Sequence, residues 1–329
     1  LTDVGLQALW LICEKNEKLK VLNLKNNGVG AKPEDSMGLM RMLTTSTALV
    51  NLNISNNALG ELGPHIKSFG RGISANKTLT TLNVSNNRLL PEGIKVVCNA
   101  LRTCTLMRDL DVSYNSPGRE AALAGMLQVH PTLRSFGVIE KEPTTRSERT
   151  FWLDTRGKEA IGRALLDSPG TVMYLQCDVF SIVEKTTTLL WTSRAPCDAI
   201  VLAGVLRSNS TLTSLNLAAT GDIGDYEREE LGRALLTNPY GKVGFCDIYR
   251  LQETTGNTYL MDLKDKDQIR SRRSFTLFAG LLRANSTLTC LTLSSIQPEH
   301  IDVLAEALAT NTTMKELKLE QPSKSADTA

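Results

Sequence analysis

The sequence has little of what catalytic and metal-binding sites are usually built from. Its 329 residues include only three histidines, His65, His130 and His300, which lie far apart and in no spacing that suits metal ligands. It contains no Gly-x-x-x-x-Gly-Lys loop of the kind that holds phosphates, and no Gly-x-Ser-x-Gly nucleophile turn. We therefore expect a protein that is not an enzyme and that holds neither a cofactor nor a metal ion.

Strong net charge and long apolar runs are also missing. Lysine and arginine total 37 against 35 aspartate and glutamate, which leaves a formal net charge of +2. Such a balance creates no field that would attract nucleic acid or an anionic membrane. The longest apolar run, residues 199–206, is far shorter than the roughly 20 residues that cross a bilayer. We expect neither nucleic-acid binding nor membrane insertion, and the oligomeric state stays open.

The seven cysteines show no pairing pattern. Their number is odd and no two stand in a Cys-x-x-Cys spacing; they are Cys13, Cys98, Cys104, Cys177, Cys197, Cys246 and Cys290. Cys177 and Cys246 occupy apolar positions of expected strands, so we interpret the cysteines as reduced core residues. Reduced cysteines favour a cytoplasmic location, with a place in a cytoskeletal or ciliary assembly as the alternative.

What the sequence does have is a repeated phrase, Leu-x-x-Leu-x-Leu-x-x-Asn. Its four copies are Leu19, Leu22, Leu24, Asn27; Leu49, Leu52, Ile54, Asn57; Leu79, Leu82, Val84, Asn87; and Met107, Leu110, Val112, Asn115. The second positions of successive copies are 30, 30 and 28 residues apart, a period typical of a solenoid. Side chains alternate along a strand, so the paired apolar residues should point inward. The asparagine should end the strand and bond main-chain groups of its own turn and of the neighbouring coil.

Amphipathic stretches follow the repeated phrases and predict a helix in most repeats. Apolar residues recur there at helical spacing, as in the stripe of Ile301, Leu304, Ala305 and Leu308. The expected helices cover Glu61 to Ile73, Pro91 to Leu101, Glu120 to Gln128, Lys158 to Leu166, Cys197 to Leu206, Glu227 to Leu236, Ser274 to Leu282 and Pro298 to Ala309. The alternation of strand and helix predicts an α/β solenoid.

Three phrases, "ANKTLTTLNVSNNRL" (75–89), "SNSTLTSLNL" (208–217) and "ANSTLTCLTL" (284–293), resemble the ribonuclease-inhibitor type of leucine-rich repeat. That type also occurs in the repeat domains of nucleotide-binding innate sensors, in the Ran GTPase-activating protein and in ciliary proteins. The resemblance implies a horseshoe with parallel strands on the concave face and helices on the convex face. It names no partner, because this fold hosts inhibitors, sensors, activators and scaffolds.

The repeats lead us to expect one solenoid over residues 1–320, with regular repeats in 1–132, irregular ones in 133–265 and regular ones in 266–320. Residues 321–329 are polar and are expected to form a disordered tail. The first ten residues resemble the back half of a repeat, so we do not expect residue 1 to be the natural start of a folded unit.

The irregular section places two strand-like runs close together in three segments: Leu133 to Leu153, Met173 to Thr192 and Val243 to Leu263. Leu175 and Leu189 are only 14 residues apart, which is too short for a strand, a helix and a return. Such a length suits a hairpin better than a parallel crossover. We favour an antiparallel hairpin with its turn near residues 184–187 over a short parallel coil.

Outward positions of the expected sheet form the natural interaction surface. They are small and polar in the first repeats and become acidic at Asp109 and Asp111. In the irregular repeats they are aromatic and acidic, which is typical of the centre of a protein-binding patch. The candidate protein-binding residues are Tyr174, Gln176, Asp178, Phe180, Phe245, Asp247 and Tyr249. The alternative is that these rings pack on a neighbouring hairpin and never meet solvent.

These observations favour a non-enzymatic protein-interaction module or scaffold with a concave or rim binding surface, as one part of a larger protein or assembly. A first alternative is a regulator of a GTPase or another enzyme, for which arginines near repeat ends are the only hint: Arg41, Arg71, Arg88 and Arg102. A second alternative is the recognition domain of an immune-type receptor. The Asn-x-Ser/Thr phrases, which a secreted receptor could glycosylate, are explained by the repeat consensus; they start at Asn53, Asn76, Asn83, Asn209, Asn285 and Asn311.

Overall fold

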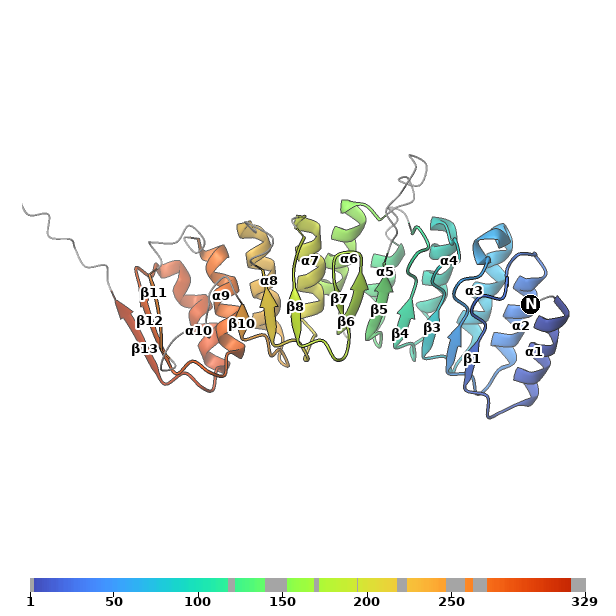
Figure 1. The fold of residues 1–329 in the computed structure, drawn as a ribbon, viewed down its shortest axis with the longest axis horizontal. Helices are drawn as coiled ribbons and strands as arrows, with labels where there is room; N and C mark the ends of the chain where they lie inside the picture. The colour runs from blue at the N-terminus through green and yellow to red at the C-terminus, as the bar shows by residue number, and fades with distance from the viewer. Residues whose placement is uncertain are drawn as a thin grey trace, which may run out of the picture. The chain divides into compact units, whose positions relative to one another are not determined.

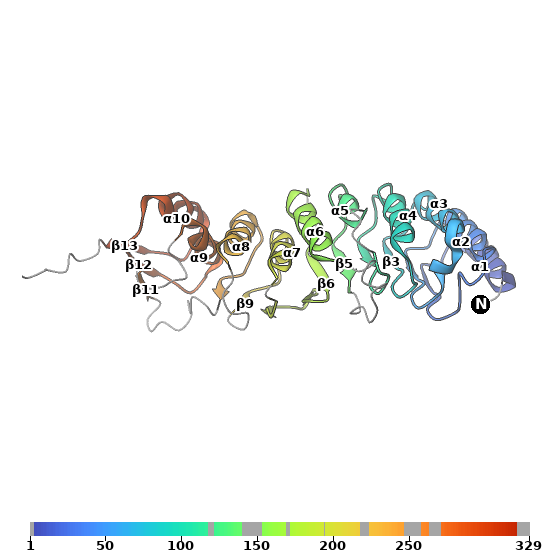
Figure 2. The same ribbon diagram turned by 90° about the horizontal axis from the view of Figure 1, so that it is seen from above.

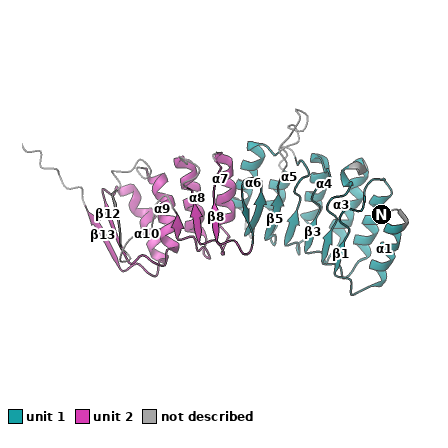
Figure 3. Ribbon diagram, in the orientation of Figure 1, with its two compact units in different colours: residues 1–183 teal, residues 184–329 magenta. Residues whose placement is uncertain are grey.

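The computed structural model describes residues 3–117, 122–139, 153–168, 172–193, 195–217, 224–246, 258–262 and 271–320. The chain divides into two compact units, residues 1–183 and residues 184–329 (Figure 3). In each unit strands and helices alternate along the chain, the strands in one layer and the helices in a second layer against it (Figure 2). The observed alternation confirms the α/β solenoid architecture within each unit.

Unit 1 contains a seven-stranded sheet whose strands follow chain order. They are β1 (Val21–Asn23), β2 (Asn51–Asn53), β3 (Thr81–Asn83), β4 (Asp109–Asp111), β5 (Ser135–Val138), β6 (Tyr174–Cys177) and β7 (Ser181–Ile182). Neighbours from β1 to β6 are parallel. The helical layer consists of α1 (Asp3–Lys15), α2 (Asp35–Thr45), the 3₁₀ helix η1 (Leu59–His65), α3 (Ile66–Ala75), α4 (Pro91–Leu101), α5 (Ala122–Leu127) and α6 (Thr155–Asp167) (Figure 1).

Unit 2 has two described sheets of three strands each. The first pairs β8 (Thr188–Leu190) with β9 (Ser214–Asn216) and β9 with β10 (Phe245–Cys246). The second contains β11 (Thr258–Asp262), β12 (Cys290–Ser294) and β13 (Glu316–Glu320) in that order. All of these pairs are parallel. The helices are α7 (Pro196–Leu206), α8 (Asp225–Thr237), α9 (Arg272–Ala284) and α10 (Pro298–Thr310).

The inward leucines of successive strands stack directly on one another. In unit 1 the register aligns Leu22, Leu52, Leu82, Leu110, Phe136 and Leu175 in one row. None of these side chains is more than 9% exposed. Each repeat thus buries its apolar edge against the next repeat, as expected of a chain that stacks units instead of enclosing one central core.

The asparagines at the strand ends form the ladder that the sequence predicted. The Asn87 side chain is fully buried, and its Nδ2 donates to the carbonyl oxygens of Ile54 and Val84 at 2.9 Å each. Its Oδ1 accepts from the main-chain N of Leu59 at 3.3 Å. Asn115 repeats the arrangement one repeat later, with Nδ2 donating back to Val84 O at 2.8 Å. Each asparagine therefore satisfies main-chain groups of its own repeat and of the one before.

A second ladder, which was not predicted from the sequence, runs where the helices turn back to the strands. Asn76 Nδ2 donates to Leu43 O of the preceding repeat at 2.9 Å, and its Oδ1 accepts from Leu79 N at 2.7 Å. In unit 2, Asn238 and Asn311 donate in the same way to carbonyl oxygens of the preceding helix, both at 2.6 Å. These amides are structural, which gives the Asn-x-Ser/Thr phrases that begin at this position a role in the fold.

The hairpin of the irregular section exists, but it is tighter than predicted. β6 pairs antiparallel with β7, with Leu175 opposite Ile182 and Gln176 opposite Ser181. The chain therefore reverses at residues 178–180, and the expected turn near residues 184–187 is wrong. Leucine spacing alone pairs Leu175 with Leu189 and leaves out Ile182, which is fully buried. Leu189 belongs instead to β8, which is parallel to β9.

The other two irregular segments show only parallel pairs where the structure describes them. β5 is parallel to both of its neighbours, and residues 140–152 of that segment lie outside the described residues. β10 is parallel to β9 and β11 is parallel to β12, whereas residues 247–257 and 263 lie outside the described residues. Residues 321–329, the expected tail, also lie outside them. A hairpin in either segment stays a prediction.

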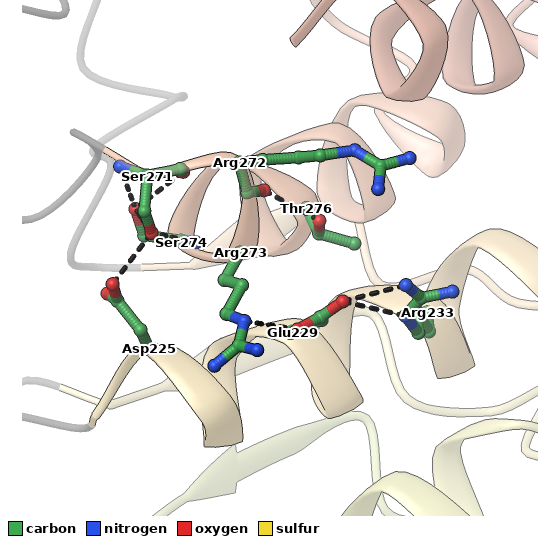
Figure 4. A network of polar contacts seen from close by, with 8 residues as sticks. All are labelled: Asp225, Glu229, Arg233, Ser271, Arg272, Arg273, Ser274 and Thr276. Atoms are coloured by element: carbon green, nitrogen blue, oxygen red, sulfur yellow. Dashed lines mark hydrogen bonds and ion pairs between the residues drawn. The ribbon is translucent and has the colours of Figure 1, made fainter. Parts of the chain in front are cut away.

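Helices α8 and α9 approach each other closely through two glycines. A Cβ atom built on Gly232 would lie 2.3 Å from the carbonyl carbon of Thr276, and one on Gly280 would lie 2.7 Å from Gly232 O. Beside this contact, Glu229 binds Arg233 at 2.7 Å and Arg273 at 3.1 Å, which ties one helix to the other (Figure 4). Because glycine has no side chain, the backbones of the two helices approach each other more closely than any other residue type would permit.

Two buried histidines make stability depend on pH. His300 is 1% exposed and stacks on Phe275 with ring centroids 4.8 Å apart. Burial lowers the pKa of His300 from 6.5, and the nearby Glu299 only partly opposes this; burial lowers the pKa of His130 as well. The folded state therefore binds a proton less readily than the unfolded chain, so stability falls as the pH drops below 6.5.

We accordingly expect the urea midpoint of unfolding to decrease between about pH 7.5 and about pH 5.5. The slope of midpoint against pH should be shallower in the His300→Gln variant, since that variant removes one of the two protonation sites. His65, which is exposed, provides the matched control: His65→Gln should leave the slope unchanged. Equal slopes in all three proteins would contradict the assignment to His300.

Candidate functional site

The outer side of the unit 1 sheet is the candidate site, and we call it the polar face. It consists of the residues of β1 to β6 that flank the buried row. In register order they are Val21, Asn51, Thr81, Asp109, Ser135 and Tyr174 in one row, and Asn23, Asn53, Asn83, Asp111, Gly137 and Gln176 in the other. Apart from the exposed β1 residues and the buried Gly137, these positions are half-buried. Their polar groups are therefore partly open to a partner.

Hydrogen bonds between neighbouring strands hold the side chains of the polar face in place. Thr81 Oγ1 donates to Asp109 Oδ2 at 3.1 Å, and Asn83 Nδ2 donates to Asp111 Oδ2 at 3.0 Å. Ser85 in turn donates to Asn83 Oδ1 at 2.7 Å. A carboxylate can accept about four hydrogen bonds, so both aspartates keep free acceptor capacity. Side chains fixed in advance lose less entropy when a partner binds.

Gly137 leaves room for one of these carboxylates. A Cβ atom at this position would lie only 2.6 Å from Asp111 Oδ1. The Asp111 side chain therefore leans over the backbone of β5, where its Oδ1 also accepts from Ser113 N at 3.0 Å. A larger residue at position 137 would displace the carboxylate, so the glycine positions Asp111 on the polar face.

Tyr114 adds an exposed aromatic ring in the turn after β4. Its φ is 60°, in the left-handed region where the equivalent residues of the earlier repeats are Asn26, Asn56 and Asn86. A bulky residue costs about 1–3 kcal/mol in such a conformation. The Tyr114 side chain is 47% exposed, so packing does not explain its presence. Tyr114 was not among the residues predicted from the sequence, although Ser-Tyr-Asn in place of Ser-Asn-Asn was a visible signal.

The seven candidate protein-binding residues predicted from the sequence do not lie together in one described patch. Tyr174 and Gln176 lie half-buried on the polar face at β6. Asp178 lies in the reversal after β6, where its Oδ2 binds Lys158 Nζ at 2.7 Å. Phe180 is only 6% exposed, contrary to the outward position expected of it, because the reversal at residues 178–180 ends the strand alternation.

The remaining three candidate residues belong to unit 2. Phe245 is half-buried in β10. Asp247 and Tyr249 lie outside the described residues. The protein-binding role of both groups stays a prediction.

Among the described residues, the titratable groups suggest no second kind of site. Within the described part of the chain, no three His, Cys, Asp or Glu residues come together in a way that could hold a metal ion. All of the cysteines but Cys177 are buried, and Cys177 is half-buried. Burial raises the pKa of Cys98 to about 12, which keeps its thiol protonated and unreactive. Among the described residues, no helix is long and apolar enough to cross a membrane.

Comparison with known proteins identifies the type of repeat but indicates no binding partner. A profile of the leucine-rich-repeat family matches residues 15–32 and 75–98. No curated protein matches the chain at a significant level.

Three solved structures are similar to this chain at low identity. The leucine-rich-repeat-containing protein LegL7 from Legionella pneumophila is 16% identical, with 95% of this chain and 87% of that chain covered and a TM-score of 0.42. Actin-binding site 2 of leiomodin-1 is 14% identical, with coverages of 61% and 87% and a TM-score of 0.36. The tropomodulin C-terminal domain of Caenorhabditis elegans is 14% identical, with coverages of 48% and 92% and a TM-score of 0.34.

Scores this low carry no argument about activity or partner. The family profile, by contrast, matches segments that contain two of the four phrases found in the sequence, and both segments lie where strand, asparagine turn and helix follow one another. The repeated phrase, its buried leucine row, its asparagine ladder and the family match together make this chain a leucine-rich-repeat protein with an α/β solenoid fold.

Proposed function

We propose that this protein is a non-enzymatic interaction module and that the polar face of unit 1 binds another protein. The observation that carries the proposal is the combination of hydrogen-bonded Asp109 and Asp111 with the exposed ring of Tyr114. Protein interfaces favour tyrosine, and carboxylates that keep free acceptor sites suit lysine or arginine. The partner surface is therefore expected to be polar and to carry at least one basic side chain.

Tyr174 and Gln176 extend the same surface at β6. The register places Ser135 between Asp109 and Tyr174 and Gly137 between Asp111 and Gln176, so β6 lies two strands from the aspartates of β4. Gln176 Nε2 donates to Ser181 Oγ at 3.3 Å, which connects the polar face to the hairpin. We propose them as peripheral contacts of the binding surface.

Regulation of a GTPase or another enzyme is the second candidate, and the arginines that motivated it are partly engaged elsewhere. Arg41 lies over the ring of Trp10 at 5.3 Å. Arg102 Nη2 donates to Gly125 O at 3.1 Å. Such contacts within the helical layer favour a structural use of these side chains. A cytoplasmic location is proposed on the odd number of cysteines and on the burial of most of them in the core.

Substitutions on the polar face test the proposal. We expect Tyr114→Asn to lower the amount of a specific co-purifying protein at least about tenfold, because an exposed aromatic anchor is typically worth 2 kcal/mol or more. Asparagine suits the left-handed backbone, so the change removes the ring and leaves the turn intact. The measurement is quantitative mass spectrometry after affinity capture from native lysate.

Tyr240→Asn is the matched control, since Tyr240 is 71% exposed in unit 2. It should leave capture unchanged, whereas Asp111→Asn should lower it. Equal recovery of every partner by the wild type, Tyr114→Asn and Asp111→Asn would overturn the assignment of the polar face. Faster GTP hydrolysis by a small GTPase in the presence of this protein would support the second candidate instead.

A further inference from the structure

The outermost strand of unit 2 leaves a strand edge and two leucines uncovered. β13 pairs with β12 on one side, and its other edge has no strand partner among the described residues (Figure 1). Leu317 and Leu319 face the core side, yet they are 38% and 48% exposed. Their register partners Leu291 and Leu293 in β12 are fully buried. The side of β13 away from β12 therefore presents an apolar surface and unpaired backbone groups together.

Helix α10 leaves the matching side of its own surface uncovered. Ile301 is 40% exposed, Ala305 is exposed and Leu308 is half-buried, and the three share one helix side by their i, i+4, i+7 spacing. The equivalent residues of α9, counted from the first helical residue, are all fully buried: Phe275, Ala279 and Leu282. We call the surface formed by Ile301, Ala305, Leu308, Leu317 and Leu319 the end face.

We propose that a second copy of this chain covers the end face. An occupant must offer both a strand edge and an apolar helix side at repeat spacing, and a second end face offers both at once. A two-fold axis perpendicular to the sheet would set β13 antiparallel to β13 of the second copy and α10 beside its own equivalent. Such an isologous contact is the commonest geometry of homodimers.

The charges of β13 discriminate between registers of this pairing. Glu316 and Lys318 lie on the same side of the strand and are 3.2 Å apart. An antiparallel pair centred on Leu317 sets Glu316 opposite Lys318 of the second copy, twice by symmetry. A pair centred on Lys318 would set Lys318 against itself and Glu316 against Glu320. Opposite charges across a pair stabilise it and like charges destabilise it, so the register centred on Leu317 is favoured over the one centred on Lys318. A pair centred on Leu319 sets Lys318 opposite Glu320; it also satisfies the charges and would respond to Lys318→Glu alone.

Charge reversal at the two positions tests the dimer. The wild type is expected to sediment with the mass of two chains at high concentration and of one chain on dilution. Glu316→Lys and Lys318→Glu should each shift the dimer towards monomer, because each sets like charges against each other. The double variant Glu316→Lys with Lys318→Glu should restore the dimer.

Mixing the two single variants gives the sharpest result. At positions 316 and 318 the Glu316→Lys chain has lysine twice and the Lys318→Glu chain has glutamate twice. An equimolar mixture should therefore form heterodimers, although neither variant dimerises well alone. Lys242→Glu, a charge reversal at an exposed lysine elsewhere in unit 2, should leave the mass unchanged. A wild type that stays monomeric at every concentration overturns the proposal, as does a dimer that is insensitive to both reversals. If a partner protein or residues 321–329 cover the end face instead, the wild type should stay monomeric at every concentration.

Discussion

Asn87→Ala is expected to lower the free energy of unfolding by about 3 kcal/mol, because it removes three buried hydrogen bonds that are each worth ~1 kcal/mol. The Asn87 side chain is fully buried and serves carbonyl oxygens of Ile54 and Val84 and the main-chain N of Leu59. Alanine removes all three bonds. The two oxygens keep the Nδ2 groups of Asn57 and Asn115 as donors, whereas the Leu59 N loses its Asn87 acceptor. The measurement is the urea midpoint and slope followed by circular dichroism.

Two further variants test whether the loss of stability comes from the ladder bonds and not from the replacement of any asparagine. Asn51→Ala changes a half-buried residue of β2 on the polar face, and its cost should stay below about 1 kcal/mol. Asn87→Asp should destabilise at least as strongly as Asn87→Ala, because a carboxylate would face carbonyl oxygens within hydrogen-bonding distance. Similar costs for Asn51→Ala and Asn87→Ala would contradict the structural role of the ladder.

Gly232→Ala is expected to destabilise unit 2 by more than about 3 kcal/mol, although alanine is normally about 1 kcal/mol better than glycine inside a helix. The added Cβ would lie 2.3 to 2.5 Å from three main-chain atoms of Thr276 and Leu277. Backbone atoms in the middle of α9 cannot move aside as a flexible side chain can. The two helices would have to separate, which opens the buried contact between them.

Gly125→Ala in α5 is the matched control for this prediction. The nearest atom to its added Cβ is Arg102 Nη2 at 3.5 Å, an ordinary contact. That variant should be neutral or slightly more stable, in line with the helix preference of alanine. Thermal unfolding of the two variants beside the wild type is sufficient, and a stabilised Gly232→Ala protein would show that the close approach of α8 and α9 is not required.

Much of unit 1 could be predicted from the sequence because its repeat is dictated locally. Strand alternation predicts that Leu22 and Leu52 point inward. The repeated asparagine predicts that the Asn57 side chain bonds main-chain groups of neighbouring repeats, as it does with Leu24 O. The hairpin turn was misplaced because the leucine period hid the contribution of Ile182. α2 was not predicted, since its buried residues Leu39, Met42 and Leu43 follow a stretch rich in turn residues.

The candidate site could be predicted only in part. Strand alternation was enough to place Asp109 and Asp111 outward, but their fixed orientation depends on Gly137, a contact between repeats that spacing does not reveal. Tyr114 stood in a turn and fell outside any strand pattern. Phe180 was expected outward because the alternation of β6 was extended past its real end.

The asparagine ladders also determine how the chain would respond to tension. Each amide bond joins one repeat to the preceding one, as Asn87 to Ile54 and Asn76 to Leu43 do. Pulling one repeat away breaks only the bonds to its neighbours, so the rest of the stack keeps its contacts. A repeat of 30 residues releases about 100 Å of extended chain when it opens. Such a molecule would act as a spring that lengthens one repeat at a time.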